Sequence, residues 1–405
     1  MKPAWREVLD TSVLVGALGY FVDSFDLNLF AIVRVASLTS LGVPEDQVLP
    51  CGVRLFNFQM VGMLLGGLLW GVLGDRIGRR TVLFGSILLY SVATAANGLV
   101  HSLEVYAWLR LVAGIGMAGE LGAAITLVSE RVSPGLRGYA TMLVASFGLL
   151  GSATAGVVTA WMSWRTAYFL GGGLGFLLLF LRVGTPESSL FRGMHHGDRR
   201  GDLRLLLGRP SRALTYLQCV LLGVPVWFTQ AILIGLAPEV TGALGVHPPI
   251  VVGIGVAWYS AGAATGDLIS GTLSQWLGSR KKALLVFLLF LTAMDAVYLS
   301  GHGWPPAAVY GLCLALGLGT GYWAVFVTVA AEQFGTNLRA TVATTVPNVV
   351  RGCSVVILSA FRGGTEPLGV LGSAATVGVV CSLLALSALA ALRETFARDL
   401  GFTES

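Results

Sequence analysis

Charged residues are scarce in this sequence, and their scarcity excludes the commonest class of protein. Lys, Arg, Asp and Glu make up 12% of the 405 residues, against roughly 25% in a typical soluble domain. Hydrophobic residues make up 55%, and the mean hydropathy is +0.78. A surface with so little charge has to face something other than water. A soluble enzyme is therefore excluded.

Cysteine is also scarce, and the chain lacks the clusters that bind metals or cofactors. The five cysteines are Cys51, Cys219, Cys313, Cys353 and Cys381. They are scattered, so they offer neither a disulfide framework nor a metal-binding pair. The pair His195-His196 lacks the second pair of ligands that a metal site needs. Gly114-x-Gly116-x-x-Gly119 matches a dinucleotide fingerprint, but it lies in an apolar helical run with no strand before it. We expect no metal, no cofactor and no enzyme activity.

Long apolar runs, by contrast, fill the chain. Runs of about 20 residues recur, and each is long enough to cross a bilayer core. We predict twelve spans, over 12–35, 55–74, 81–100, 105–130, 138–161, 165–183, 214–236, 250–276, 283–301, 306–331, 340–361 and 368–392. The first run is too long and too charged for a cleavable signal peptide, because it contains Asp23, Asp26 and Arg34. The sequence predicts an all-α polytopic membrane protein.

The basic residues set the orientation of these spans. With the N-terminus inside, 20 of the 26 basic residues lie in cytoplasmic segments, Arg182 among them, and four lie outside. Basic loops stay on the cytoplasmic side of a membrane. We therefore expect an integral protein of the cell (inner) membrane with both termini in the cytoplasm. The net charge of +5 then reflects topology and does not indicate a nucleic-acid partner.

A repeat divides the chain into halves. The basic stretch 184–212 separates six spans in residues 1–183 from six in residues 213–405. The motif Gly71-x3-Asp75-x2-Gly78-Arg79 returns 200 residues later, with Gln275 in place of the acid, and Glu130-x6-Arg137 returns after 202 residues as Glu332-x6-Arg339. Such repeats indicate two parallel six-helix halves with a solute site between them.

These motifs resemble those of a known family. The run Gly71-Val-Leu-Gly-Asp75-Arg76-Ile-Gly78-Arg79-Arg80 resembles the signature loop of the major facilitator superfamily at every fixed position. The stretch from Arg110 to Arg137 resembles the fourth-helix pattern of its sugar-porter and organic-ion branches. Asp23-Ser-Phe-Asp26 is similar to the Asp-Gly-x-Asp of its aromatic-acid/proton symporters, with Ser24 replacing the glycine. The resemblance covers the whole chain and implies a major facilitator fold.

Ionisable side chains within spans are costly in a bilayer, so they are the default functional candidates. Asp23 and Asp26 lie three residues apart on one helical face near the middle of the first span. In the sugar/proton symporters that the chain resembles, residues matching Asp26 and Arg110 form the proton-coupling pair. Glu120 falls roughly 15 Å deeper than Arg110 and near the midplane. It could titrate, contact substrate or bond to a neighbouring helix, and Asp23 could serve coupling, substrate binding or packing.

The second half offers one buried base, and the loops offer a gate. Arg351 is a planar fork suited to a substrate carboxylate, although it could instead neutralise Asp267 or Asp295. Asp267 lies toward the cytoplasmic side, where we expect a gate residue. The resemblance implies that further gate residues latch the two halves at the cytoplasmic mouth: Asp75, Arg76, Arg79, Glu130 and Arg137. Close helix packing is predicted by three small-residue spacings: Gly62-x3-Gly66, Gly67-x3-Gly71 and Gly262-x3-Gly266.

Together these features favour secondary active transport by alternating access, driven by the proton gradient, with a small organic anion as substrate. A sugar or polyol is the alternative, because the same fourth-helix motif accompanies sugar porters. A non-transporting receptor would be a different class. The expected partners are a small-molecule solute, protons and membrane lipids, and we expect the protein to work as a monomer.

Overall fold

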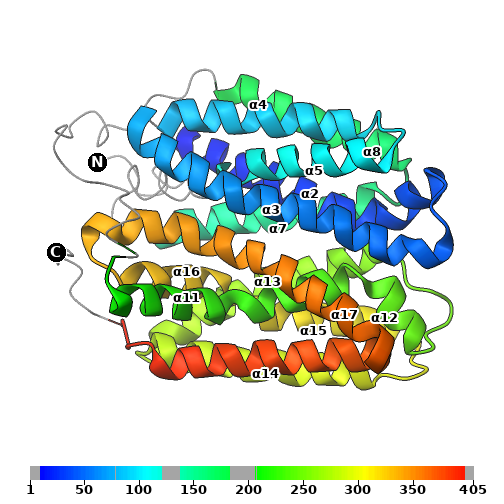
Figure 1. The fold of residues 1–405 in the computed structure, drawn as a ribbon. Helices are drawn as coiled ribbons and strands as arrows, with labels where there is room; N and C mark the ends of the chain where they lie inside the picture. The colour runs from blue at the N-terminus through cyan, green and yellow to red at the C-terminus, as the bar shows by residue number, and fades with distance from the viewer. Residues whose placement is uncertain (1–9, 78, 121–136, 183–205, 207, 397–405) are drawn as a thin grey trace. The chain divides into compact units, whose positions relative to one another are not determined.

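The computed structural model describes residues 10–77, 79–120, 137–182, 206 and 208–396. In these ranges the regular secondary structure is helical, and none of the described residues lies in a strand (Figure 1). The chain divides into two compact units, one of residues 1–42 and 58–201 and the other of 43–57 and 202–405. The predicted linker 184–212 lies mostly outside the described residues, so its boundaries stay a prediction.

The helices of the first unit follow the predicted spans. They are α2 (Thr11–Ser40), α3 (Glu45–Ile77, whose first part belongs to the second unit), α4 (Arg79–Asn97), α5 (Leu103–Met117), α7 (Arg137–Val158) and α8 (Trp164–Arg182). Helix α2 packs along α7 and α8, and α4 packs along α5 and α8. The predicted fourth span over 105–130 begins as α5, and residues 121–136 lie outside the description.

The helices of the second unit are more irregular. They are α11 (Pro210–Phe228), the π-helix η1 (Thr229–Ile234), α12 (Ala237–Ala243), α13 (Val252–Trp276), α14 (Arg280–Ser300), α15 (Pro306–Thr320), α16 (Trp323–Glu332) and α17 (Thr336–Ala391). Pro225 lies inside α11 and cannot donate a backbone hydrogen bond, and the wider π turn begins four residues later at Thr229. The predicted tenth span is divided at Gly321 and Tyr322 into α15 and α16.

Helix α17 joins the two spans predicted over 340–361 and 368–392. The expected loop between them is replaced by helix, and the backbone leaves helical geometry at Gly369 (φ 70°, ψ 172°). Glycine adopts such a positive φ without a steric penalty. Figure 1 shows the chain reversing its direction where α17 passes from orange to red. Two spans are present, but the chain turns from one to the other almost without leaving the helix.

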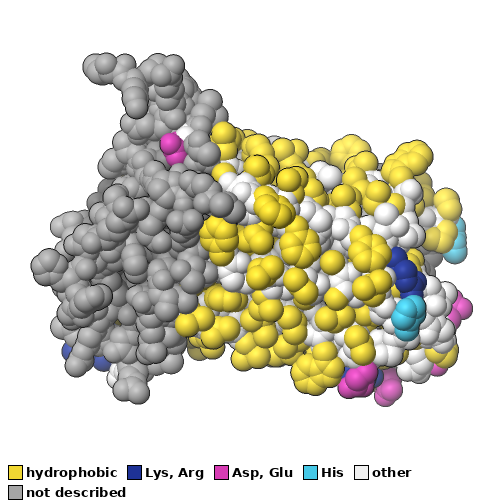
Figure 2. All heavy atoms as spheres, turned by 90° about the horizontal axis from the view of Figure 1, so that it is seen from above, with side chains coloured by type: hydrophobic (Ala, Val, Ile, Leu, Met, Phe, Trp, Pro, Cys, Tyr) yellow, Lys and Arg dark blue, Asp and Glu magenta, His cyan; other side chains and the backbone are white. Residues whose placement is uncertain are grey.

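The described surface is largely apolar, and several charged side chains are buried. Large hydrophobic side chains are exposed, such as Trp161 at 87% and Phe180 at 73%, whereas Arg34 and Arg110 are each 1% exposed. Hydrophobic side chains cover most of the described part of the face in Figure 2, and charged ones gather at its end. Among the described residues, seven helices are long and apolar enough to cross a membrane, α17 counting as one. This distribution suits lipid as the solvent.

Glycines bring pairs of helices into backbone contact in both units. A Cβ at Gly62 or Gly66 of α3 would overlap a carbonyl oxygen of α5. In the second unit, a Cβ at Gly262 or Gly266 of α13 would overlap a carbonyl oxygen of α15. The close packing predicted from these two spacings is therefore confirmed, and it fixes the helices that carry the buried charges.

Candidate functional site

The two acids of α2 are buried in the first unit. Asp23 is fully buried and Asp26 is 2% exposed. Thr94 Oγ1 of α4 donates a hydrogen bond to Asp26 Oδ2 at 3.4 Å. Gly171 of α8 lies directly against Asp26, since a Cβ there would overlap the carboxylate. Asp26 therefore lies where α2, α4 and α8 meet, and the missing side chain at Gly171 leaves it room.

Arg110 of α5 acts electrostatically on Asp26 but forms its hydrogen bond and its ring contact with other residues. Its guanidinium donates to Gln59 Oε1 of α3 and lies over the Phe30 ring, 4.6 Å from the centroid. No ion pair joins it to Asp26 within the part of the chain that the structure describes. Arg110 and Asp23 both act electrostatically on Asp26. The predicted coupling residues therefore influence one another without an ion pair between Asp26 and Arg110.

Glu120 forms a buried ion pair that the sequence did not predict. Arg182, the last residue of α8, contacts it through two nitrogens: Nη2 lies 3.0 Å from Oε2 and Nη1 lies 3.2 Å from Oε1. Ser86 Oγ of α4 also donates to Glu120 Oε1, at 3.2 Å. Both charged side chains are almost fully buried, at 1% and 2% exposure. The twofold contact suits the planar guanidinium and compensates two charges in a dry environment.

The pair joins residues at the ends of two helices. Glu120 lies three residues beyond Met117, where α5 ends, and Arg182 is the last residue of α8. Arg182 lies at the end of the predicted span over 165–183 and was counted among the basic residues of the cytoplasmic segments. The structure shows it buried against an acid. The midplane position of Glu120 stays a prediction.

In the second unit Arg351 is 2% exposed and is separate from the two acids considered as its partners. Its Nη1 donates to Asn348 Oδ1, one turn earlier in α17, at 3.5 Å. Thr229 of η1 donates to Asp295 at 3.0 Å. No ion pair between Arg351 and Asp267 or Asp295 is seen within the described residues. Both roles considered for Arg351, binding a substrate carboxylate and neutralising one of these acids, stay predictions.

Asp267 of α13 acts as a helix cap in this structure. Its Oδ1 accepts a hydrogen bond from the backbone N–H of Ala324, at 3.1 Å. Ala324 is the second residue of α16, which begins after the break at Gly321 and Tyr322. A carboxylate at a helix start satisfies an N–H that has no partner in the helix. This capping contact was not predicted, and the gate role of Asp267 stays a prediction.

The predicted gate of the first unit lies largely outside the description. Asp75 and Arg76 belong to the end of α3, Arg79 begins α4 and Arg137 begins α7, but their side chains are not among those described. Glu130 lies outside the described residues altogether.

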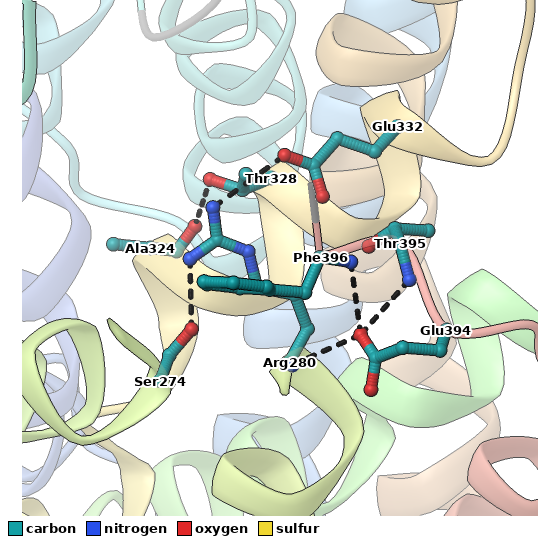
Figure 3. Close-up of polar contacts among 8 residues, drawn as sticks. All are labelled: Ser274, Arg280, Ala324, Thr328, Glu332, Glu394, Thr395 and Phe396. Carbon is teal, nitrogen blue, oxygen red and sulfur yellow. Dashed lines mark hydrogen bonds and ion pairs between the residues drawn. The ribbon is translucent and has the colours of Figure 1, made fainter. Parts of the chain in front are cut away.

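The repeated motifs of the second unit do meet in one cluster, shown in Figure 3. Arg280, the first residue of α14, pairs with Glu332 at 3.6 Å and donates to Ser274 Oγ at 2.7 Å. Its guanidinium lies over the Phe396 ring, 5.5 Å from the centroid. Glu332 ends α16 and Ser274 is in α13, so one arginine joins three helices and the segment after α17.

Glu394, just beyond α17, caps α14 in the same cluster. Its carboxylate accepts hydrogen bonds from Ser279 Oγ and from the backbone N–H groups of Arg280 at 3.0 Å and Lys281 at 3.2 Å. Partial burial would raise the pKa of Glu394, but these hydrogen bonds outweigh it and lower the pKa to about 2. Sequence reasoning missed this residue, because it lies 114 residues from the helix that it caps.

Buried charges within lipid-facing helices define a polytopic membrane protein with an internal polar site. The family model of the Major Facilitator Superfamily matches residues 16–357. The chain belongs to the Major Facilitator Superfamily, whose members are transporters and not enzymes. Its fold is the twelve-helix fold of that family in two halves, which confirms the predicted fold class.

Three curated relatives carry different solutes. The 3-(3-hydroxy-phenyl)propionate transporter of Escherichia coli is 29% identical over 60% of this chain and 60% of its own length. The niacin transporter of Acinetobacter baylyi is 32% identical over 44% of this chain and 40% of its own length. The sialic acid transporter of Escherichia coli is 26% identical over 73% of this chain and 72% of its own length. The alignments thus span about half the length of the first two.

Two solved structures resemble the whole chain. A D-xylose-proton symporter has a TM-score of 0.72 at 16% identity, covering 98% of this chain and 99% of its own. A proton:xylose symporter bound to 6-bromo-6-deoxy-D-glucose has a TM-score of 0.74 at 15% identity, covering 98% of both chains. At these identities the likeness concerns the fold.

Proposed function

We propose that this chain is a secondary active transporter of the cell (inner) membrane that moves a small organic anion by alternating access, coupled to protons at Asp26. The observation that carries the proposal is the state of Asp26. It is buried in a span, Thr94 holds one carboxylate oxygen at 3.4 Å, and the other has no hydrogen-bond partner among the described residues. A carboxyl group in such a place has to be protonated or paired.

Arg110 supplies the pairing that makes proton binding depend on conformation. When Arg110 approaches Asp26, the charged carboxylate is favoured, and when it withdraws, the protonated form is favoured. In this structure Arg110 binds Gln59, the arrangement expected of the separated pair. If conformation changes proton affinity, protonation changes the conformational equilibrium by the same free energy. Asp23 and Glu120 are the alternative coupling or substrate-contacting carboxylates.

An organic anion is the substrate that the remaining charges and the relatives favour. Arg351 is buried within a span, and its planar guanidinium suits a substrate carboxylate. Niacin, hydroxyphenylpropionate and sialic acid, named for three relatives, all carry a carboxylate at neutral pH. A sugar or polyol is the second candidate, because the fold resembles two xylose symporters.

The cytoplasmic mouth completes the proposed cycle. We assign the gate to the signature loop and its partners: Asp75, Arg76, Arg79, Glu130, Arg137 and Asp267. Both termini are placed in the cytoplasm by the excess of basic residues in the loops on that side. Neutralising Asp75 as Asp75→Asn is expected to weaken inner closure and to increase the labelling of a cysteine introduced on the cytoplasmic side.

Flux into proteoliposomes under an imposed proton gradient tests the proposal. The probes are nicotinate, 3-(3-hydroxyphenyl)propionate, sialic acid and D-xylose, each radiolabelled. We expect Asp26→Asn to abolish gradient-driven accumulation of the accepted acid while sparing counterflow, which needs no net proton movement. The matched control is Asp46→Asn, which neutralises an exposed acid.

Three outcomes would contradict the proposal. Accumulation of the probe by Asp26→Asn would show that another carboxylate couples protons. Uptake of D-xylose with no uptake of the three acids would favour the sugar candidate. Binding of a probe without any flux in wild type would indicate a receptor.

A further inference from the structure

One face of α4 is polar although the helix is buried in the first unit. Ser86, Tyr90 and Thr94 recur every four residues, so they line one face, and Ser91 lies beside them. All four side chains are at most 1% exposed. Ser86 and Thr94 are eight residues apart, about 12 Å along the helix. Buried hydroxyl groups in an apolar environment are costly unless they serve a partner or a function.

The two ends of this α4 polar stripe each contact a buried acid. At one end Thr94 donates to Asp26, and at the other Ser86 donates to Glu120, which is paired with Arg182. The stripe therefore connects the proposed coupling carboxylate to a second carboxylate near the start of α4. In the proposed topology, the start of α4 faces the cytoplasm.

The middle of the stripe holds two buried hydroxyl groups between the two ends that contact the acids. Among the described residues, neither the Tyr90 hydroxyl nor the Ser91 hydroxyl has a hydrogen-bond partner, although both side chains are fully buried. Tyr90 is wedged between two helices, because its backbone lies against Gly116 of α5 and its ring against Gly175 of α8. Side chains of a helix lean toward its start, so the Tyr90 hydroxyl leans from the Asp26 end toward the Glu120 end.

The charged groups around Tyr90 come from each helix packed against it. Glu120, which follows α5, acts electrostatically on the hydroxyl, and so do Asp26 and Asp23 of α2 and Arg182 of α8. A tyrosine hydroxyl can accept a proton on one lone pair while it releases its own.

We propose that the α4 polar stripe carries the coupling proton between Asp26 and Glu120, with Tyr90 as the relay. The inference rests on the proposed proton coupling at Asp26. The proton leaves the Asp26 carboxyl, each hydroxyl passes one proton on and ends neutral, and Glu120 gains the proton. Protonated Glu120 loses its attraction to Arg182, which loosens the contact between the residue after α5 and the end of α8 before the proton is released toward the cytoplasm.

The test follows the arrival of protons at Asp26 without any substrate. Inside-out membrane vesicles containing the protein receive a pH jump on the cytoplasmic face. Time-resolved infrared spectroscopy then follows the carboxyl band that Asp26→Asn removes. We expect Tyr90→Phe to slow this band at least about 10-fold while its final amplitude stays unchanged. Tyr168→Phe is the matched control, because it removes a buried hydroxyl of the same unit that bonds to Tyr106.

Glu120→Gln is a second, independent variant in case Tyr90→Phe folds poorly. It removes the carboxylate at the end of the stripe away from Asp26. We expect it to slow the appearance of the Asp26 band as much as Tyr90→Phe does. Wild-type rates in both variants would overturn the relay and leave coupling at Asp26 intact. A rate lowered equally by Tyr168→Phe would mean that any lost hydroxyl disturbs the unit, and would also overturn it. No Asp26 band in wild type would overturn the proton coupling itself, and the relay with it.

Discussion

In each unit two helices pack backbone against backbone at a glycine, a contact that we call the crossing. The side chains beside the crossing differ between the two units. In the first unit Gly114 of α5 packs on the backbone of Gln59 in α3, and in the second Gly317 of α15 packs on the backbone of Tyr259 in α13. A Cβ at either glycine would overlap the carbonyl oxygen opposite. The paired positions are separated by 203 and 200 residues, close to the offsets of the repeated motifs. Backbone contact is thus common to both units.

The chemistry beside the crossing differs. Arg110 precedes the contact in α5 by four residues and donates to the Gln59 side chain, whereas the corresponding residue of α15 is Cys313, a buried thiol. The crossing therefore requires glycine and does not require charge. Charge at this point belongs to the first unit, together with Asp26, and we attribute it to transport.

The largest effect is expected from breaking the crossings themselves. Gly114→Val and Gly317→Val each place a branched side chain against a carbonyl oxygen that cannot rotate away. We expect each to cost about 3 kcal/mol or more of unfolding free energy, measured by denaturant unfolding in micelles. Gly173→Val and Gly311→Val are the controls, because nothing lies within 4 Å of a Cβ at these glycines. A stable Gly317→Val would show that the crossings are not equivalent.

The second-largest effect is expected from a substitution that removes the charge beside the crossing and leaves the backbone contact in place. Arg110→Met leaves Gln59 Oε1 without its donor, costing about 1–3 kcal/mol of stability, and we expect it to abolish proton-driven uptake of the accepted probe. Cys313→Ala, at the matching position, is expected to keep uptake. Loss of uptake in both variants, or in neither, would contradict the assignment of charge to transport.

Substitutions of Arg351 test whether the second unit contributes a charged side chain that binds the substrate. We expect Arg351→Lys to weaken binding of the accepted acid at least about 10-fold, or about 1.4 kcal/mol, because a point charge replaces a planar fork. Titration calorimetry measures it, with Arg362→Lys, an exposed arginine of the same helix, as control. Unchanged binding in Arg351→Ala would make the residue structural.

The smallest effect is expected at the start of α14, which Glu394 caps. The folded-state pKa of Glu394 is about 2, below the ordinary 4.5, so its contribution to stability is complete above about pH 4.5 and is lost as the pH falls toward 2. We expect Glu394→Gln to lower Tm slightly at pH 7, with the difference from wild type shrinking over that window. The exposed Glu366→Gln serves as control. A difference independent of pH would rule out the charged cap as its cause.

The sequence by itself determined the membrane class, the helices and their repeat. Hydropathy adds up along a single segment, so long apolar runs identify spans before any neighbour is known. The repeated offsets and the Gly262-x3-Gly266 spacing can likewise be read from the sequence alone. The close packing of α13 against α15 confirms the prediction made from that spacing. The burial of Asp26 and Arg110 could also be predicted, because each lies well inside a span.

Only the tertiary structure decided which partners the buried charges have. Arg182 lies at the end of a predicted span and was counted among the cytoplasmic basic residues, whereas the packing of α4 against both α5 and α8 brings it to Glu120. Asp267 caps α16 and Glu394 caps α14 because distant segments fold together. A single sequence records the cost of burying a charge, but the compensation for that cost comes from residues on other helices, and their positions follow from packing alone.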